Sequence, residues 1–203
     1  GYAAQKRTEV WRDATRLWLD AARKAPEKAR PWNNLGLAYF RQGDLARAAR
    51  HFEKSAALDP GYSLPRFNLA MLALRLGRPE EAERELRAAI DRDPTHPLPW
   101  LELGKLLADL GRNDAAADAF ERAISLREDY FDAHLGLGLV RLRAGDDAAA
   151  ERSLLRAAEL RYREFMPHQA LRALYERTGR EEKAEEEAMV LQELKERLAR
   201  PGE

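Results

Sequence analysis

A period of 34 residues constrains this chain more than any other feature. Five glycines follow it, at Gly43, Gly77, Gly111, Gly145 and Gly179. Each of them comes after a segment with helical spacing of apolar residues. We therefore expect each one to end a helix in the left-handed conformation that favours glycine. A fixed period of this length predicts a stack of similar units along the chain.

Further registers with the same period predict how the helices pack and end. Small residues that allow two helices to approach closely recur at Ala14, Ala48, Ala82, Ala116, Ala150 and Ala184. Four residues later, and so on the same helical face, bulky residues recur at Trp18, Phe52, Leu86, Phe120 and Leu154, with Ala188 as the exception. Another register consists of Leu35, Leu69, Leu103, Leu137 and Leu171. Pro26, Pro60 and Pro94 are placed to end one helix before the next unit begins.

Composition and charge exclude several classes of site and argue against several classes of partner. The 203 residues include 35 basic and 35 acidic side chains and no cysteine. Disulfides and thiolate metal sites are therefore excluded, and balanced charge gives no electrostatic case for a nucleic-acid partner. No apolar run is long enough to cross a bilayer, so we expect no direct membrane insertion. The first methionine is Met71, so we expect the chain to be part of a longer protein, in either a cytoplasmic or an extracytoplasmic compartment.

The motifs within the period resemble the tetratricopeptide repeat (TPR). The match is carried by Trp32-Asn33-Asn34-Leu35-Gly36-Leu37-Ala38-Tyr39, followed by Ala48, Phe52 and Leu58-Asp59-Pro60. A second copy reads Trp100-Leu101-Glu102-Leu103-Gly104, with Ala116, Phe120 and Ala123. The resemblance covers about residues 8 to 198 and implies an all-α chain, a right-handed superhelical solenoid of antiparallel helix pairs with about 11 helices. The departures are Arg66, His134 and His168 in place of tryptophan, and Arg172 in place of the small residue between paired helices.

The repeat predicts one continuous domain over residues 1–203. It consists of a half-unit helix at 8–25, TPR units at 29–62, 63–96, 97–130 and 131–164, and a degenerate unit plus capping helix at 165–203. The first helices of the pairs are expected near 30–42, 64–76, 98–110, 132–144 and 166–178. The last helix begins with a run of glutamates, which is typical of a solvated face on a terminal cap.

No pattern in the chain indicates catalysis, a cofactor or a metal. There is no P-loop, nucleophile elbow or metalloprotease motif, and Gly136 and Gly138 lie within an expected helix, where they indicate close packing. His134 and His168 share one repeat position on successive first helices, but a third ligand for zinc is missing. We interpret both histidines as packing residues.

The TPR resemblance implies a concave groove, lined by the first helices, that binds extended peptides or partner helices. We expect the partner-binding residues to be Asn33, Asn34, Leu37, Arg41, Leu64, Phe67, Asn68, Met71, Arg75, Leu98, Leu101, Lys105, Leu135, Leu139 and Arg143. The same helices add Phe40, Leu74, Glu102, Asp109, Leu142, Gln169, Glu176 and Arg177. Such an apolar surface suits an amphipathic helix or an apolar extended segment.

Within this set, Asn34 and Asn68 are placed to hold a peptide backbone, and Arg41, Arg75 and Arg143 to form a ridge that favours an acidic partner. The alternative is that some of the leucines only pack the first helices together. Binding of an acidic chaperone tail is not expected. The positions that hold such a tail in the family are Asn33, Leu37, Asn68, Leu98 and Glu102 here, and only Asn68 fits.

The leading functional prediction is a non-catalytic scaffold that binds a protein or peptide in this groove. Self-assembly into a homo-oligomer is a second possibility, motivated by Trp11 and Trp18 of the half-unit. A third comes from Trp11-Arg12-Asp13 to Gly36, which is similar to the start of the extracytoplasmic TPR tail of multispanning membrane O-mannosyltransferases. In that case this segment would position an acceptor or partner, and catalysis would reside elsewhere.

Overall fold

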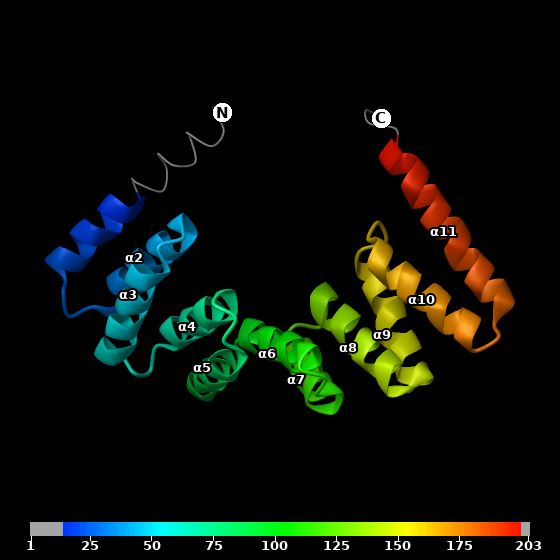
Figure 1. Cartoon of the computed structure of the whole chain (residues 1–203), viewed down its shortest axis with the longest axis horizontal. Helices are drawn as coiled ribbons and strands as arrows, with labels where there is room; N and C mark the ends of the chain where they lie inside the picture. Colours follow the sequence, from blue (N-terminus) through cyan, green and yellow to red (C-terminus); the bar gives the residue numbers. More distant parts are fainter. Residues whose placement is uncertain (1–13, 200–203) are drawn as a thin grey trace. The chain divides into compact units, whose positions relative to one another are not determined.

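The computed structural model describes residues 14–199, and every regular element in that range is an α-helix (Figure 1). The described part of the N-terminal helix runs from residue 14 to residue 24. The helices after it are α2 (Ala29–Gln42), α3 (Leu45–Leu58), α4 (Ser63–Arg75), α5 (Pro79–Arg92), α6 (Pro97–Asp109), α7 (Asn113–Leu126), α8 (Phe131–Ala144), α9 (Asp147–Leu160), α10 (Phe165–Arg177) and α11 (Glu181–Ala199). The predicted first helices are α2, α4, α6, α8 and α10, and their bounds agree with the expected ones to within about one residue.

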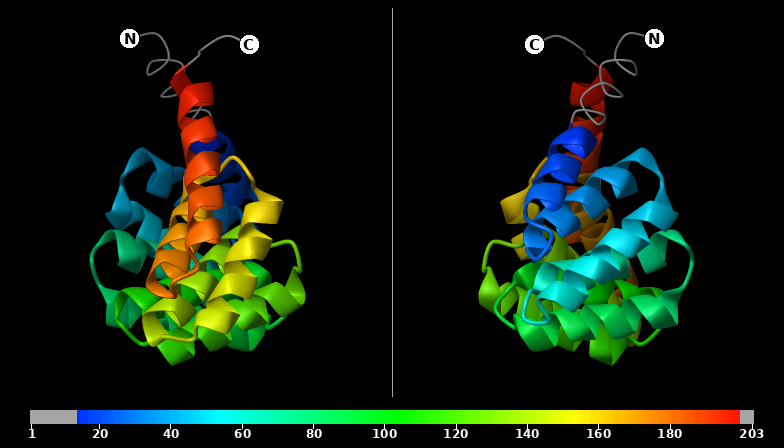
Figure 2. Two further views of the ribbon diagram at one scale, coloured as in Figure 1. Left: turned by 90° about the vertical axis from the view of Figure 1, so that its right-hand side faces the viewer. Right: turned by 90° about the vertical axis from the view of Figure 1, so that its left-hand side faces the viewer.

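The chain divides into two compact units, Gly1–Thr95 (unit 1) and His96–Glu203 (unit 2). Unit 1 holds the N-terminal helix and the pairs α2/α3 and α4/α5. Unit 2 holds the pairs α6/α7, α8/α9 and α10/α11, and the two members of each pair pack along each other (Figures 1 and 2). Helix pairs in series confirm the predicted fold class for the described residues. The single-domain organisation stays a prediction.

The glycine register ends the first helices as expected. All five glycines of the register have positive φ, between 68° and 84°. After α2, for example, the amide of Gly43 donates to the carbonyl of Phe40, and the amide of Asp44 donates to that of Tyr39. This Schellman arrangement satisfies carbonyls at the helix end and turns the chain toward the second helix. The turn is therefore encoded locally, once in every 34 residues.

The alanine and bulky registers form the contact within each pair. Ala48, Ala82, Ala116 and Ala150 are fully buried, as are Phe52, Leu86 and Leu154. Opposite the bulky residue, the first helix carries a residue with little or no side chain. A Cβ added at Gly36 would lie 2.7 Å from the ring of Phe52, and one at Gly138 would lie 2.6 Å from Leu154. These pairs therefore approach to backbone contact, as the sequence predicts.

The last pair reverses this arrangement. Arg172 of α10 stands where other first helices carry glycine or alanine, and Ala188 of α11 stands where other second helices carry a bulky residue. The two residues line the same pocket between α10 and α11, which still pack together. In this pair the large and the small residue have therefore changed places between the two helices.

A second pair of positions links the first and second helix of each helix pair, and the sequence pattern does not predict it. The tryptophan position of the first helix faces a position 19 residues later on the second helix. Three of these pairs make direct contacts. Trp32 stacks on His51 with 5.6 Å between ring centroids, Arg66 Nη1 lies 2.9 Å from Glu85 Oε2, and His168 Nδ1 lies 2.7 Å from Glu187 Oε2. The remaining two pairs are Trp100 with Ala119 and His134 with Ser153.

The histidines at the tryptophan position keep the hydrogen bond of the indole. Trp32 Nε1 donates to the carbonyl of Pro26, six residues earlier, at 2.9 Å. His134 Nε2 makes the same contact to the carbonyl of Glu128 at 2.8 Å, and His168 Nε2 to that of Tyr162 at 2.9 Å. Because a carbonyl oxygen only accepts, the Nε2 atom of each histidine carries a proton. Histidine therefore replaces the polar function of tryptophan with a smaller ring.

Candidate partner-binding surface

The predicted groove residues lie on the first helices, and these helices are neighbours within each unit. In unit 1, α2 contacts α4. In unit 2, α8 contacts both α6 and α10. Each unit therefore presents a continuous first-helix surface, as the TPR resemblance implies.

Unit 1 contains a pocket on this surface. A cavity of about 180 Å³ between the N-terminal helix and α2 is lined by Ala14, Trp18, Asn34, Leu37, Ala38 and Arg41. Three of the predicted residues, Asn34, Leu37 and Arg41, thus lie together. Arg41 is exposed, Ala38 is buried and the other lining residues are half-buried, so the pocket combines an apolar wall with an amide and a cation.

Trp18 is the pocket residue that the prediction placed in a different role. Its 34-residue register predicts a packing role, and the possibility of self-assembly requires it to be exposed. In the structure Trp18 is half-buried, packs against the core around Leu35 and Phe52, and also lines the pocket. The signal that could have found it is its position on the helix that packs against α2. Trp11 lies outside the described residues.

The asparagines of unit 1 hold the first helices to each other. Asn68 Nδ2 of α4 donates to Asn33 Oδ1 of α2 at 2.8 Å, and Asn33 Nδ2 faces Asn34 Oδ1 at 3.4 Å. Asn33 is only 2% exposed, so it supports the surface from beneath. Asn68 uses one of its two N–H bonds within the protein, and its remaining hydrogen-bonding groups and those of Asn34 are the ones left for a ligand.

Arg75 and its repeat equivalent Arg177 bind the preceding first helix. Arg75 Nη1 donates to the carbonyl of Phe40 at 3.1 Å, and Arg177 Nη1 donates to the carbonyl of Leu142 at 3.2 Å. A cation at the C-terminal end of a helix is favoured by the helix dipole and by the unpaired carbonyls there. The expected ridge is therefore partly structural. Arg143, by contrast, is exposed and has no ion-pair partner among the residues that the structure describes.

The other predicted residues of unit 1 lie on α4. Leu64 is 36% exposed, Phe67 and Met71 are half-buried, and Arg75 is exposed. α4 therefore offers an apolar strip that ends in a charged residue. This is the pattern that an amphipathic segment would complement.

In unit 2 the predicted residues divide into supporting and accessible ones. Leu101 is 2% exposed, so it belongs to the core, and the alternative interpretation of packing leucines holds for it. Leu98, Leu135 and Leu139 are half-buried, and the last two pack against the core around Leu154 and Leu171. Lys105 is exposed, and its Nζ pairs with Glu102 Oε1 at 3.0 Å.

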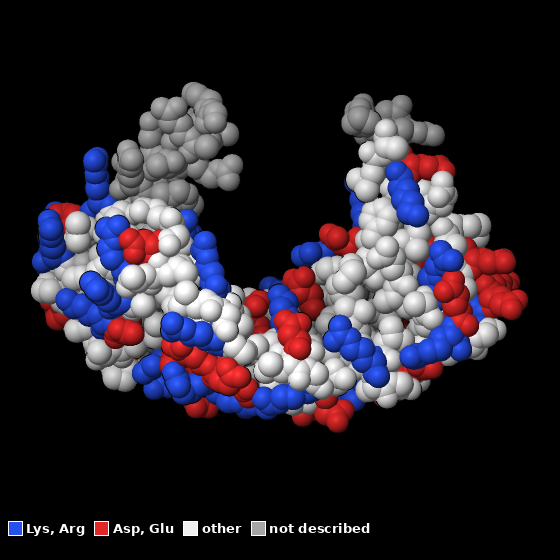
Figure 3. Space-filling model, in the orientation of Figure 1, with Lys and Arg blue, Asp and Glu red and all other residues white. Residues whose placement is uncertain are grey.

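Charge is distributed unevenly over the surface of unit 2. Acidic side chains gather where α11 begins, at Glu181, Glu182, Glu185 and Glu186, which are all exposed (Figure 3). The cavity of about 510 Å³ between α10 and α11 is largely polar, with Gln169, Arg172, Glu176, Gln192 and Lys195 among its lining residues. The role of α11 as a capping helix stays a prediction.

Two further observations bear on metals and membranes. Within residues 14–199, no three histidine, aspartate or glutamate side chains come close enough to hold a metal ion. In the same range, no helix has both the length and the apolar character needed to cross a membrane.

The family models that match this chain all describe the same family. Two family models described as tetratricopeptide repeat match the chain, one at residues 1–63 and 101–165, the other at 39–106 and 73–119. The solved structure of MamA is 25% identical and covers 81% of this chain and 96% of its own, with a TM-score of 0.77. YrrB, described as a TPR protein with an unusual peptide-binding site, is 19% identical and covers 87% of this chain and 91% of its own, also at 0.77.

A third solved structure, the PilF protein of Pseudomonas aeruginosa, is 20% identical and covers 81% of this chain and 75% of its own, with a TM-score of 0.71. No curated protein matches the chain. The helix pairs, the glycine register and the family models lead to one conclusion: the chain belongs to the tetratricopeptide repeat family, whose members are generally non-catalytic scaffolds for protein interaction.

Proposed function

We propose that this chain is a non-catalytic scaffold that binds a peptide or an amphipathic helix on the first-helix surface of unit 1. The observation that carries the proposal is the pocket formed by Trp18, Asn34, Leu37 and Arg41. The pocket combines an aromatic ring, an apolar side chain, an amide and a cation. Apolar area with a few polar groups is the combination that binds and orients a peptide side chain. The fold shared with YrrB, a protein described as peptide-binding, supports the same reading.

The partner that fits this surface is an apolar segment with an acidic group near one end. Leu37, Phe67 and Met71 supply apolar area, and Leu64 extends it to an accessible position. Arg41 is the exposed cation at the pocket. Charge-assisted contacts at the rim would set orientation more than affinity, because exposed ion pairs contribute little.

The test uses two leucines of equal chemistry in unit 1. Leu64 on the first helix α4 is 36% exposed, and Leu58 on the second helix α3 is 38% exposed. We expect Leu64→Glu combined with Arg41→Glu to abolish binding of the native partner, and Leu58→Glu to leave it unchanged. The partner is identified by crosslinking from position 64 in an extract of the source organism that includes detergent-solubilised membranes. Affinity is then measured by calorimetry on the purified pair.

The result that contradicts the proposal is equal binding by the two variants, with both folded by circular dichroism. Leu101→Glu is unsuitable for this experiment because Leu101 is buried, and a charge there would unfold the unit. A crosslink to a second copy of the chain would support the alternative of self-assembly, and a strict monomer in light scattering at high concentration would argue against it.

The similarity to the TPR tail of membrane O-mannosyltransferases stays a prediction. Part of the segment that carries it, Trp11-Arg12-Asp13, lies outside the described residues. Apolar segments encoded before Gly1 in the native gene would support this origin, and the scaffold proposal holds with or without it.

A further inference from the structure

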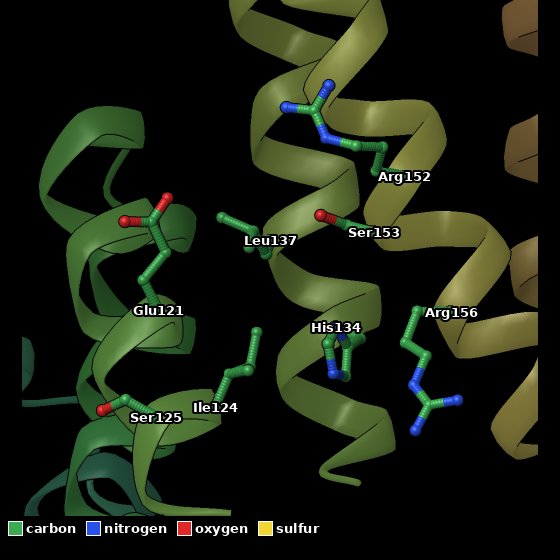
Figure 4. Close-up of a pocket in the computed structure, with 8 residues that line it drawn as sticks. All are labelled: Glu121, Ile124, Ser125, His134, Leu137, Arg152, Ser153 and Arg156. Atoms are coloured by element: carbon green, nitrogen blue, oxygen red, sulfur yellow. The ribbon is translucent and has the colours of Figure 1, made fainter. Parts of the chain in front are cut away.

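Unit 2 contains a second pocket that shares no residue with the predicted groove. Its cavity of about 320 Å³ lies between α7, α8 and α9. Ile124 of α7 and Leu137 of α8 face each other across it, and His134 lies at its lower end (Figure 4). The hydroxyl of Ser153 on α9 points into the same space, and the guanidinium of Arg152 lies at the upper end.

The pocket exists because one cross-helix pair is unusually small. The five pairs that link first and second helices are Trp32 with His51, Arg66 with Glu85, Trp100 with Ala119, His134 with Ser153, and His168 with Glu187. The other four contain either a tryptophan or a carboxylate. His134 with Ser153 contains neither, so the space between the helices is left partly empty. Among the described residues Ser153 has no hydrogen-bond partner, although it is only 9% exposed.

The neighbouring pair in the same unit shows what fits this position. In the α10/α11 pair, His168 contacts the Glu187 carboxylate through Nδ1 and the Tyr162 carbonyl through Nε2. The Tyr162 carbonyl only accepts, so Nε2–H donates to it and Nδ1 is the ring atom that meets the carboxylate. The Arg66–Glu85 pair of unit 1 places a carboxylate at the same repeat position. Two of the other helix pairs therefore carry a glutamate at the repeat position that Ser153 occupies in α9.

Charges around the pocket favour an anion. Glu121 of α7 lines it, but Glu121 Oε1 accepts from Arg141 Nη2 of α8 at 2.9 Å and is therefore neutralised. Arg156 of α9 pairs with Glu159 at 3.0 Å. Arg152, on the same helix, has no ion-pair partner among the described residues. The pocket is therefore lined by one uncompensated cation and one hydroxyl without a hydrogen bond.

We propose that this pocket binds a carboxylate carried on an apolar body. The carboxylate takes the place that Glu187 fills beside His168, where it accepts from the Ser153 hydroxyl, and the guanidinium of Arg152 at the upper end of the pocket attracts it electrostatically. His134 already donates its Nε2–H to the carbonyl of Glu128, so the ligand meets Nδ1, the ring atom that faces Glu187 in His168. The apolar body packs between Ile124 and Leu137.

The experiment follows the imidazole resonances of the chain by NMR at pH 6, where an ordinary histidine is largely protonated. The chain has four histidines, which are assigned with single His→Gln variants. Benzoate is titrated against the full chain, with benzamide as its uncharged analogue. We expect benzoate to shift the His134 signal with a Kd of about 1 mM, a value typical of a small ligand with few contacts. His168 is the internal control, because Glu187 already occupies its site.

The decisive variant is Ser153→Glu, which supplies the carboxylate from the chain itself and recreates the pair of His168 with Glu187. It should weaken benzoate binding at least tenfold while the far-ultraviolet circular dichroism stays unchanged. If Ser153→Glu does not fold, Arg152→Gln serves instead and should weaken binding severalfold. Equal shifts of His134 by benzoate and benzamide, or undiminished benzoate binding by both variants, would overturn the proposal.

A second titration identifies the source of the carboxylate. The blocked peptide acetyl-Leu-Glu-Leu-amide carries it on a side chain, whereas benzoate is a free acid. A shift of His134 by benzoate alone assigns the pocket to small free carboxylates, and a shift by the peptide alone assigns it to acidic side chains of a partner. A response to both supports the shared chemistry, and a response to neither rejects it.

Discussion

The ring of Phe120 on α7 is held between two glycines, and this arrangement yields a quantitative prediction for Gly104→Ala. A Cβ at Gly104 of α6 would lie 2.7 Å from two ring atoms, well inside the 3.4 Å at which ordinary contact begins. Gly136 of α8 lies against the far edge of the ring, where an added Cβ would be 2.5 Å from Cζ. Phe120 is 1% exposed, so the ring has no free space into which it can move.

Two effects of this substitution oppose each other. Alanine is favoured over glycine in a helix interior by about 1 kcal/mol. Overpacking a close-packed core costs about 1 to 3 kcal/mol, and the trapped ring places this site at the upper end of that range. We therefore expect a net loss of about 2 kcal/mol in the free energy of unfolding. For a chain of this size that lowers the apparent Tm by about 4 to 8 °C.

The chain provides its own control, because the equivalent positions in the α4/α5 pair are Ala70 and Leu86. Gly104→Ala combined with Phe120→Leu recreates that natural pair. Urea unfolding of the wild type, both single variants and the double variant gives a thermodynamic cycle. We expect the double variant to be more stable than the sum of the single effects by about 1 to 2 kcal/mol. A stabilising Gly104→Ala, or additive free energies, would refute the steric explanation.

Three further predictions concern pH and packing. The pKa of His51 is lowered from its ordinary 6.5, first by burial and then by Lys54. The unfolded chain therefore binds more protons, so stability should fall as pH drops below about 6.5 in urea titrations, and His51→Gln should flatten that slope. Burial and a hydrogen bond to Glu151 raise the pKa of Tyr175 to about 12. Stability should therefore decline between pH 10 and 12, and the last phenolate to appear in an ultraviolet titration should be missing in Tyr175→Phe. Ala82 is fully buried at a helix crossing, so Ala82→Trp should lower the apparent Tm by several degrees in a circular dichroism melt, and an unchanged melt would contradict the packing register.

The sequence predicted the parts of the fold that depend on local chemistry. Gly43 and its repeats end the first helices because only glycine adopts their positive φ without strain. The buried alanine and bulky registers follow from helical periodicity, which places residues four apart on one face. The bounds of α2, α4, α6, α8 and α10 follow from these two signals. The predicted TPR fold and family are confirmed for these reasons.

The binding surface was less predictable because exposure depends on packing between helices. Repeat position alone could not distinguish Leu64, which is accessible, from Leu101, which is buried. Repeat position also could not show that Arg75 donates a hydrogen bond to the end of α2, or that Asn68 donates one to Asn33. Those outcomes depend on neighbouring helices that lie more than 30 residues away in the chain.

The 34-residue repeat by itself determined where each helix begins, ends and meets its partner, because those features recur in every unit. Only the tertiary structure decided which side chains oppose each other across a pair. Trp32 stacks on His51, Arg66 pairs with Glu85, and His168 pairs with Glu187. Each pair fills the same space between two helices with different residue types, so the 34-residue period does not reveal which residues are in contact. The pocket at Ser153 arises from this variation, since the pair there is too small to fill a space that the repeat keeps constant.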